Sequence, residues 1–346
     1  MYKEQLKLLK RIPLNSANRF LIHKSHAFVC ELYGLAREIH ILDLTDPADP
    51  KHLRSIRFQR SIGSLAIHND KLYATESLRA LHEFDLSEIS NPKFLESYIL
   101  LGYDLYDLQI REDKAVLAMN WQGVGIVDLK KPDTIQPTFM QKIDKGFVKQ
   151  LVPFRDSFLL TNNSEFLYSI SILNGNLNKI EKHSFPDFKP SKIFPNGEEF
   201  LLFGETKKGK KEFSSLLLLD KNLGAIGDPI AIRNSPVKCL PLSDGNILCC
   251  FDYSYSYLDR KQKKILPLFE LFENRETKEY VEIPSKVKNQ SSESDEDEYD
   301  SRRNDLYCFD SLSALYKRGN HLFAIHGNSF LTFLISEDSL LQKIVE

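Results

Sequence analysis

The sequence lacks the features that mark disulfide-stapled, membrane-spanning and strongly charged proteins. Its five cysteines are odd in number and show no C-x-x-C spacing, which argues against a disulfide framework and a zinc knuckle. No apolar run approaches the length of a membrane span. Charged residues interrupt the apolar pairs of the N-terminal stretch MYKEQLKLLKRIPL, so we expect no signal peptide. The sequence therefore predicts a cytoplasmic protein without a membrane segment.

Strong net charge and the common catalytic motifs are also missing. With 46 basic and 48 acidic residues the net charge is −2, which favours neither nucleic acid nor an anionic membrane as a partner. The sequence contains no Gly-rich phosphate loop and no G-x-S-x-G elbow. His23, His26 and His68 suggest a metal only weakly, because residues three apart in a strand face opposite sides. We therefore predict no catalytic residue, no metal site and no cofactor.

What the sequence does contain is a repeat. The stretch IHILDLTDPADP at 39–50 is followed by HEFDLSEISNP at 82–92, with the same order of apolar run, Asp and Pro-containing turn. A second feature, a polar turn followed by an apolar run, recurs along the whole chain. The first apolar residues of these runs are spaced by 45, 43, 43, 42, 47 and 75 positions. We call them the anchors, and they are Ala27, Leu72, Ala115, Phe158, Phe200, Ile247 and Leu322.

Each repeat predicts a few short strands and is too small for a domain. Runs such as NILCCF and GVGIVD, bounded by Gly, Asn and Asp, are typical of buried strands. A period near ~43 residues with about four strands per unit is typical of a β-propeller blade. We therefore predict an all-β, single-domain, seven-bladed β-propeller over residues 1–346. The ring is predicted to close across the termini, with the N-terminal segment completing the last blade; the C-terminal segment LLQKIV is the alternative for that place.

The recurring Asp lies where the third strand of a blade ends. An Asp side chain can accept backbone N–H groups two residues on, and a following Pro stops the strand. Equivalent positions in successive blades favour a structural interpretation over a catalytic one. We therefore assign rim turns to Asp43, Asp85, Asp128, Asp220 and Asp259.

Segments 39–50 and 82–92, and more loosely VGIVDLKKPD at 124–133, resemble the LVIVD-repeat β-propellers, in which an apolar run ends in Asp before a proline turn. The later units keep the strand and lose that turn, so the resemblance covers about the first 145 residues. It implies a propeller and no one activity, because a fold does not determine a function.

Residues 275–305 are predicted to form a disordered acidic insertion, because they offer few apolar side chains to bury. A solvated loop is one interpretation. The other is a regulatory loop, since Ser292 and Ser294 each precede an acid by three residues, as acidophilic kinases prefer. The acidic residues of the insertion are Glu293, Asp295, Glu296, Asp297, Glu298 and Asp300.

Propeller wiring brings the outer-to-inner connections and the second-to-third-strand connections to one face, which we call the top face. Loops on a rigid scaffold often bind ligands, and Trp, Tyr and Arg are enriched at binding hot spots. Aromatic residues that merely plug the blade tops are the structural alternative. The candidate partner-binding residues on these connections are Tyr33, Arg37, Arg60, Arg79, Tyr103, Tyr106, Trp121, Arg233, Tyr253 and Tyr255.

Together these features predict a non-enzymatic module, monomeric by itself, that holds another protein on its top face. It would act as an adaptor or scaffold, or as an inhibitor of the immunity-protein type. The alternative is an enzyme, a hydrolase or lyase, with a central top-face active site.

Overall fold

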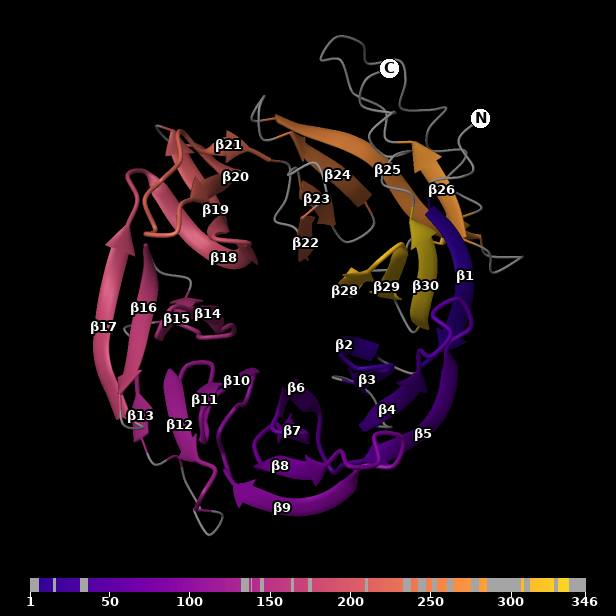
Figure 1. Ribbon diagram of the computed structural model, residues 1–346. Coiled ribbons are helices and arrows are strands. Elements are labelled where there is room, and N and C mark those ends of the chain that lie inside the picture. Colours follow the sequence, from indigo (N-terminus) through magenta and orange to yellow (C-terminus); the bar gives the residue numbers. More distant parts are fainter. Residues whose placement is uncertain are drawn as a thin grey trace. The chain divides into compact units, whose positions relative to one another are not determined.

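The computed structural model is built from β-strands (Figure 1). They group into two compact units: unit 1 comprises residues 1–17, 46–50 and 236–346, and unit 2 comprises residues 18–45 and 51–235. Among the described residues, no helix has the length and apolar character to cross a membrane. The structure describes residues 6–14, 17–31, 37–131, 137, 139–143, 146–162, 165–173, 176–208, 211–232, 238–241, 247–250, 254–259, 264–274, 280–284, 306–307, 312–326 and 329–335.

Unit 2 contains five antiparallel sheets of four strands, each made of strands consecutive in the chain (Figure 1). The first contains β2 (Ala17–His23), β3 (His26–Glu31), β4 (Glu38–Asp43) and β5 (Lys51–Arg57). The second contains β6 (Ile62–His68), β7 (Lys71–Glu76), β8 (Ala80–Asp85) and β9 (Lys93–Ile99). The third contains β10 (Asp107–Arg111), β11 (Lys114–Ala118), β12 (Val124–Asp128) and β13 (Phe139–Gln141). The fourth contains β14 (Val152–Phe154), β15 (Ser157–Thr161), β16 (Phe166–Leu173) and β17 (Asn176–Ser184). The fifth contains β18 (Phe188–Asn196), β19 (Glu199–Lys208), β20 (Lys211–Leu219) and β21 (Ile230–Ala231).

The core of unit 2 lies between successive sheets. Phe28 and Ile41 of the first sheet pack with Leu72 and Phe84 of the second, and similar clusters join the second to the third, the third to the fourth and the fourth to the fifth. A middle strand is therefore covered on both faces, and β4 and β12 are buried along almost their whole length, whereas the last strand β5 is mostly exposed. This explains why the middle strands read as continuous apolar runs.

Unit 1 contains two sheets. One contains β1 (Leu6–Pro13), β30 (Ser329–Ile335), β29 (His321–His326) and β28 (Leu312–Arg318), in that order. The other contains β22 (Lys238–Pro241), β23 (Ile247–Cys250), β24 (Ser254–Asp259), β25 (Lys264–Asn274) and β26 (Tyr280–Pro284), and β27 (Leu306–Tyr307) also pairs with β25.

The expected count of seven blades is therefore corrected: in the residues that the structure describes there are six four-stranded blades. The strands of the remaining repeat belong to the larger sheet, in which β26 and β27 lie beyond the edge of β25. The prediction of a disordered insertion over 275–305 is also wrong for Tyr280–Pro284, which form β26. The alternating YVEIP pattern suits a strand, and the edge of β25 supplies its hydrogen-bonding partners. The six acidic residues from Glu293 to Asp300 lie outside the described residues.

The N-terminal segment is a strand that pairs antiparallel with β30 from Leu6 to Pro13. Arg11 Nε donates to Ser329 Oγ at 2.8 Å, and Lys10 Nζ lies 2.7 Å from a carboxylate oxygen of Asp49, all within unit 1. The alternative segment LLQKIV lies outside the described residues. Closure of a ring across the termini stays a prediction.

The rim turns are confirmed where the structure describes the Asp side chain. Asp43 Oδ1 accepts the N–H of Thr45 at 2.8 Å, and Asp85 Oδ1 accepts that of Ser87 at 2.8 Å. Asp128 and Asp220 accept N–H groups two residues on at 3.1 and 2.7 Å. Each carboxylate thus caps the turn that follows its strand, as the repeat predicts. The side chain of Asp259 lies outside the described part of the chain.

Candidate interaction surface

At one end of unit 2, the connections between strands hydrogen-bond to one another. Leu78, between β7 and β8, donates its N–H to Tyr103 O at 2.9 Å and accepts the N–H of Gly102 at 3.2 Å. Asn120, between β11 and β12, exchanges two backbone hydrogen bonds of 2.9 Å with Val148. In the second and third sheets, the second-to-third connection is thus fastened to the connection that follows the same sheet. These are the two sets of loops that the wiring assigns to the top face.

Side chains centred on Asp104 tie three of these loops together. Asp104 Oδ2 accepts Asn120 Nδ2–H at 2.8 Å, and its Oδ1 accepts the hydroxyl of Ser77 at 3.0 Å. Gln122 Oε1 accepts the N–H of Asp104 at 3.1 Å, while Gln122 Nε2 donates to Gly102 O at 3.2 Å. The loops are therefore held in one conformation before any partner binds.

The turn at 119–123 requires a glycine. Gly123 has a φ of +93°, and a Cβ atom there would lie 2.1 Å from Gln141 O. A side chain is therefore excluded both by the backbone conformation and by the close approach of β13. The tight turn projects Trp121 outward.

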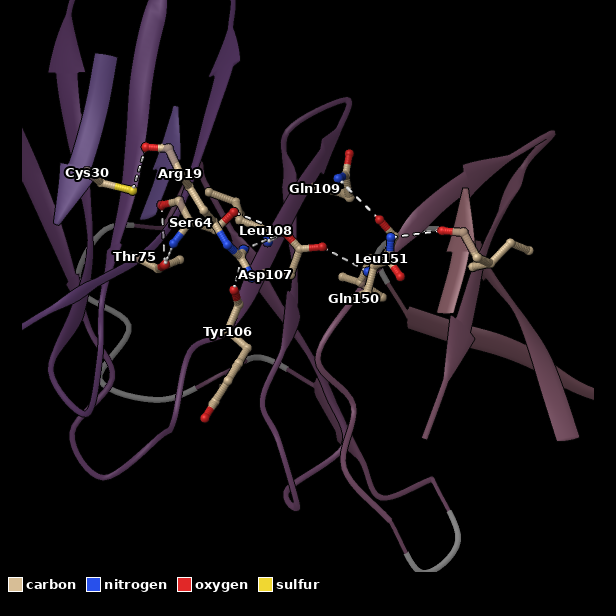
Figure 2. A network of polar contacts seen from close by, with 11 residues as sticks. Arg19, Cys30, Ser64, Thr75, Tyr106, Asp107, Leu108, Gln109, Gln150 and Leu151 are labelled. Atoms are coloured by element: carbon tan, nitrogen blue, oxygen red, sulfur yellow. Dashed lines mark hydrogen bonds and ion pairs between the residues drawn. The ribbon is translucent and has the colours of Figure 1, made fainter. Parts of the chain in front are cut away.

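A second hydrogen-bond network joins β2, β6 and β10, the first strands of the first three sheets (Figure 2). Asp107, at the start of β10, accepts the hydroxyl of Ser64 at 2.9 Å and the N–H of Leu151 at 2.9 Å. Arg19 on β2 donates through Nη1 to Tyr106 O at 2.8 Å, and the same nitrogen lies 3.6 Å from Asp107 Oδ1. One carboxylate thus joins segments of three neighbouring sheets and a loop leading to a fourth.

The comparisons with known proteins address the fold. No family model and no curated protein sequence matches the chain. Among solved structures, it is similar to the WD40 β-propeller domain of Doa1, with a TM-score of 0.57, 10% identity, and coverage of 96% of this chain and 98% of that one. The computationally designed Ika8 protein is similar at a TM-score of 0.54 and 10% identity, over 92% of this chain and 83% of that one. The fold is a β-propeller. The LVIVD likeness of the first blades remains a resemblance, because no family model supports it.

The top-face loops of this propeller carry exposed apolar side chains. Trp121 is 57% exposed and Leu101 is 66% exposed, and Leu78 and Phe147 are exposed on the neighbouring loops. We call these four residues the apolar patch. Trp121 lies between Asn120 and Gln122, which bond to Asp104, Val148 and Gly102, so it sits on one of the fastened loops. Sequence reasoning selected Trp121 and missed Leu78, Leu101 and Phe147, because single apolar residues on separate loops give no local signal.

Two of the predicted arginines contact Glu76, a carboxylate that the sequence did not single out, and a third contacts the neighbouring Gln59. Glu76 Oε1 accepts the N–H groups of Gln59 and Arg60, both at 2.7 Å, and its Oε2 lies 3.1 Å from Arg79 Nε. Arg37 Nη1 donates to the carbonyl of Gln59. The Arg79 side chain is thus engaged in an ion pair with Glu76, whereas Arg37 and Arg60 are exposed.

Glu76 also holds a histidine that sequence reasoning missed. His82 Nε2 lies 2.9 Å from Glu76 Oε2, and its Nδ1 lies 2.7 Å from Ser97 Oγ. Because a carboxylate only accepts, the neutral ring donates from Nε2 and accepts the Ser97 hydroxyl. Burial lowers the pKa of His82, and the Glu76 carboxylate opposes this shift. His40 and Ser55 make the equivalent contact at 2.8 Å one blade earlier, and this shared 15-residue spacing was the available signal.

The structure describes some, but not all, of the remaining predicted partner-binding residues. Tyr103 packs against the core between the second and third sheets, and the ring of Tyr106 has Lys149 Nζ 5.5 Å from its centroid. Tyr255, expected in a connection, instead lies in β24 as the register partner of Cys250, because the alternating SYSYLD run continues the strand to that point. Tyr33, Arg233 and Tyr253 lie outside the described residues. In the part of the chain that the structure describes, no group of three or more His, Cys, Asp or Glu residues is placed to hold a metal ion.

Proposed function

We propose that this propeller is a protein-binding module whose partner docks on the apolar patch. The observation that carries the proposal is the exposure of Trp121 and Leu101 on loops that hydrogen bonds already hold in place. Exposed apolar side chains that cluster on a soluble protein mark interaction sites, and Trp is enriched at hot spots. A preformed loop conformation also lowers the entropy lost on binding.

Charge indicates the chemistry of the partner. Arg37, Arg60 and Lys149 are exposed on the top-face connections, whereas the carboxylates of Asp104 and Asp107 are engaged in networks. A partner segment that combines apolar side chains with carboxylates suits this surface, because opposite charges favour encounter and correct orientation. In this proposal the protein is a cytoplasmic monomer that acts as an adaptor, a scaffold or an inhibitor. Such a binding role requires no cofactor.

The test compares variants in native extract. Tagged wild-type protein is expected to retain one stoichiometric protein, and Trp121→Ala and Leu101→Ser to retain it with much lower affinity. A hot spot contributes about 2 kcal/mol or more, which corresponds to about 30-fold in Kd. Leu95→Ser is the matched control, because Leu95 is 47% exposed but lies on the outer strand β9. Circular dichroism confirms that each variant is folded, and quantitative mass spectrometry measures the partner.

Two results would overturn the proposal. A partner that binds all variants equally would place the interface elsewhere. Recovery of a bound metal or metabolite in place of a protein would favour the enzyme alternative with a central site.

A further inference from the structure

Two buried cysteines face each other in unit 1. Cys239 on β22 and Cys249 on β23 are register partners in an antiparallel pair. Their Sγ atoms lie 3.8 Å apart, so that one thiol donates to the other, and neither cysteine is in a disulfide. No other cysteine in the described residues has this arrangement: Cys250 has Lys238 as its register partner, and the Cys30 thiol donates to Arg19 O at 3.5 Å.

The position of the pair suits a covalent bond between the two sulfurs. Directly opposed residues of antiparallel strands have Cα atoms about 4.5–5.5 Å apart, within the range of about 4.4–6.8 Å found for disulfides. The Sγ atoms must approach from 3.8 Å to about 2.05 Å, which rotation of the two side chains can accomplish without separating the strands. The ladder of β22 and β23 already holds the partners in place, so little entropy is lost in bringing the thiols together.

We propose that Cys239 and Cys249 form an oxidation site that converts reversibly between a dithiol and a disulfide, with hydrogen peroxide as the oxidant. Cys239 is 5% exposed and Cys249 is 0% exposed, so we expect peroxide to react first at Cys239. Its thiol gives up a proton, the thiolate attacks one peroxide oxygen, the O–O bond breaks, and the departing hydroxide takes up that proton, so that a sulfenic acid and one water form. The Cys249 thiol then attacks the sulfenic sulfur, the S–O bond breaks, and a second water leaves. Two thiols lose two electrons and two protons in total, and one peroxide is reduced to two waters.

The disulfide would tie β22 to β23 and so stabilise the edge of the larger sheet of unit 1. Cross-linking restricts the unfolded chain between the two cysteines, which raises the stability of the folded state. This site is independent of the apolar patch, which belongs to unit 2.

The experiment treats the full-length folded protein with hydrogen peroxide and maps its cysteines by non-reducing digestion and mass spectrometry. The expected product is a Cys239–Cys249 cross-linked peptide that dithiothreitol reverses, together with a rise of several degrees in the thermal midpoint. Cys30 serves as the internal control and should stay reduced, because it is fully buried and its thiol donates to the carbonyl of Arg19.

A second measurement tests the order of the steps. In Cys249→Ser, peroxide should leave a sulfenic acid on Cys239 that dimedone traps, and the thermal midpoint should not rise. In Cys239→Ser, Cys249 should give no dimedone adduct. A wild-type digest in which Cys239 pairs with Cys250, or in which both cysteines stay reduced while Cys30 is oxidised, would overturn the proposal.

Discussion

At the scale of single residues, this propeller relies on buried and half-buried carboxylates that hold loops from neighbouring strands. The Glu76 side chain, which is almost fully buried, accepts from two backbone N–H groups and contacts Arg79 and His82. Asp104 and Asp107 play the same part for the next connections. Each carboxylate has several donors, which offsets the cost of removing it from water. The top-face loops therefore owe part of their shape to these acids.

Because burial lowers the pKa of His82 below its ordinary value of 6.5, the folded protein favours the neutral ring. The unfolded chain then binds more protons below that pH, and acidification favours unfolding. The thermal midpoint should therefore fall between about pH 7.5 and about pH 5.5, and His52 and His183, whose pKa values burial also lowers, should add to the slope.

Differential scanning fluorimetry across this pH range measures the slope, and His82→Gln should reduce it. The control is His68→Gln, because His68 contacts Asn69 at an exposed turn. An unchanged slope in His82→Gln would show that the histidine does not titrate with unfolding.

At the scale of elements, the rim turn is the repeated device that ends a blade's third strand. Thr45 donates both its N–H and its hydroxyl to Asp43 Oδ1, at 2.8 and 2.6 Å, and the hydroxyl is the leading cause that lowers the pKa of Asp43. Asp43→Ala should lower the free energy of unfolding by about 1 kcal/mol, or the thermal midpoint by about 2–4 °C. Asp43→Asn keeps an acceptor and should lose less. Equal losses in the two variants, measured by urea denaturation, would show that the turn does not depend on the acceptor.

The repeat allowed the strands to be predicted, because local pattern determines them. Every anchor is buried: the first six lie in the second strand of their sheet, and Leu322 lies in β29, between β28 and β30. The blade count was not predictable in the same way, since the long last interval leaves open whether its extra residues form strands, and Tyr280–Pro284 do so by pairing with β25. The contacts of Asp104 with Asn120 and of Glu76 with His82 were not predictable either. Side-chain partners depend on strand register and loop geometry, and the sequence repeat gives no information about these.

At the scale of the whole molecule, the two ends of the chain share a sheet. Among the described residues, the first strand, β1, pairs with the last strand, β30, so residues from near the N-terminus complete the sheet of β28, β29 and β30. Without β1, the edge of β30 would present unpaired N–H and C=O groups, which favour aggregation. This pairing closes the sheet; closure of the ring remains to be tested.

Removing residues 1–14 should therefore destabilise the protein. The deletion removes the ladder from Leu6 to Pro13, the contact of Arg11 with Ser329, and the buried side chains of Ile12 and Leu14. Burial of an aliphatic side chain contributes about 1.5–3 kcal/mol, so a loss of about 10 °C in the thermal midpoint and lower solubility are expected. Deletion of residues 1–5, which precede β1, is the control and should leave the midpoint close to that of the full chain. Calorimetry of both truncations makes the comparison: if the longer deletion keeps the full-length midpoint, β1 contributes no stability, and the prediction of closure across the termini fails with it.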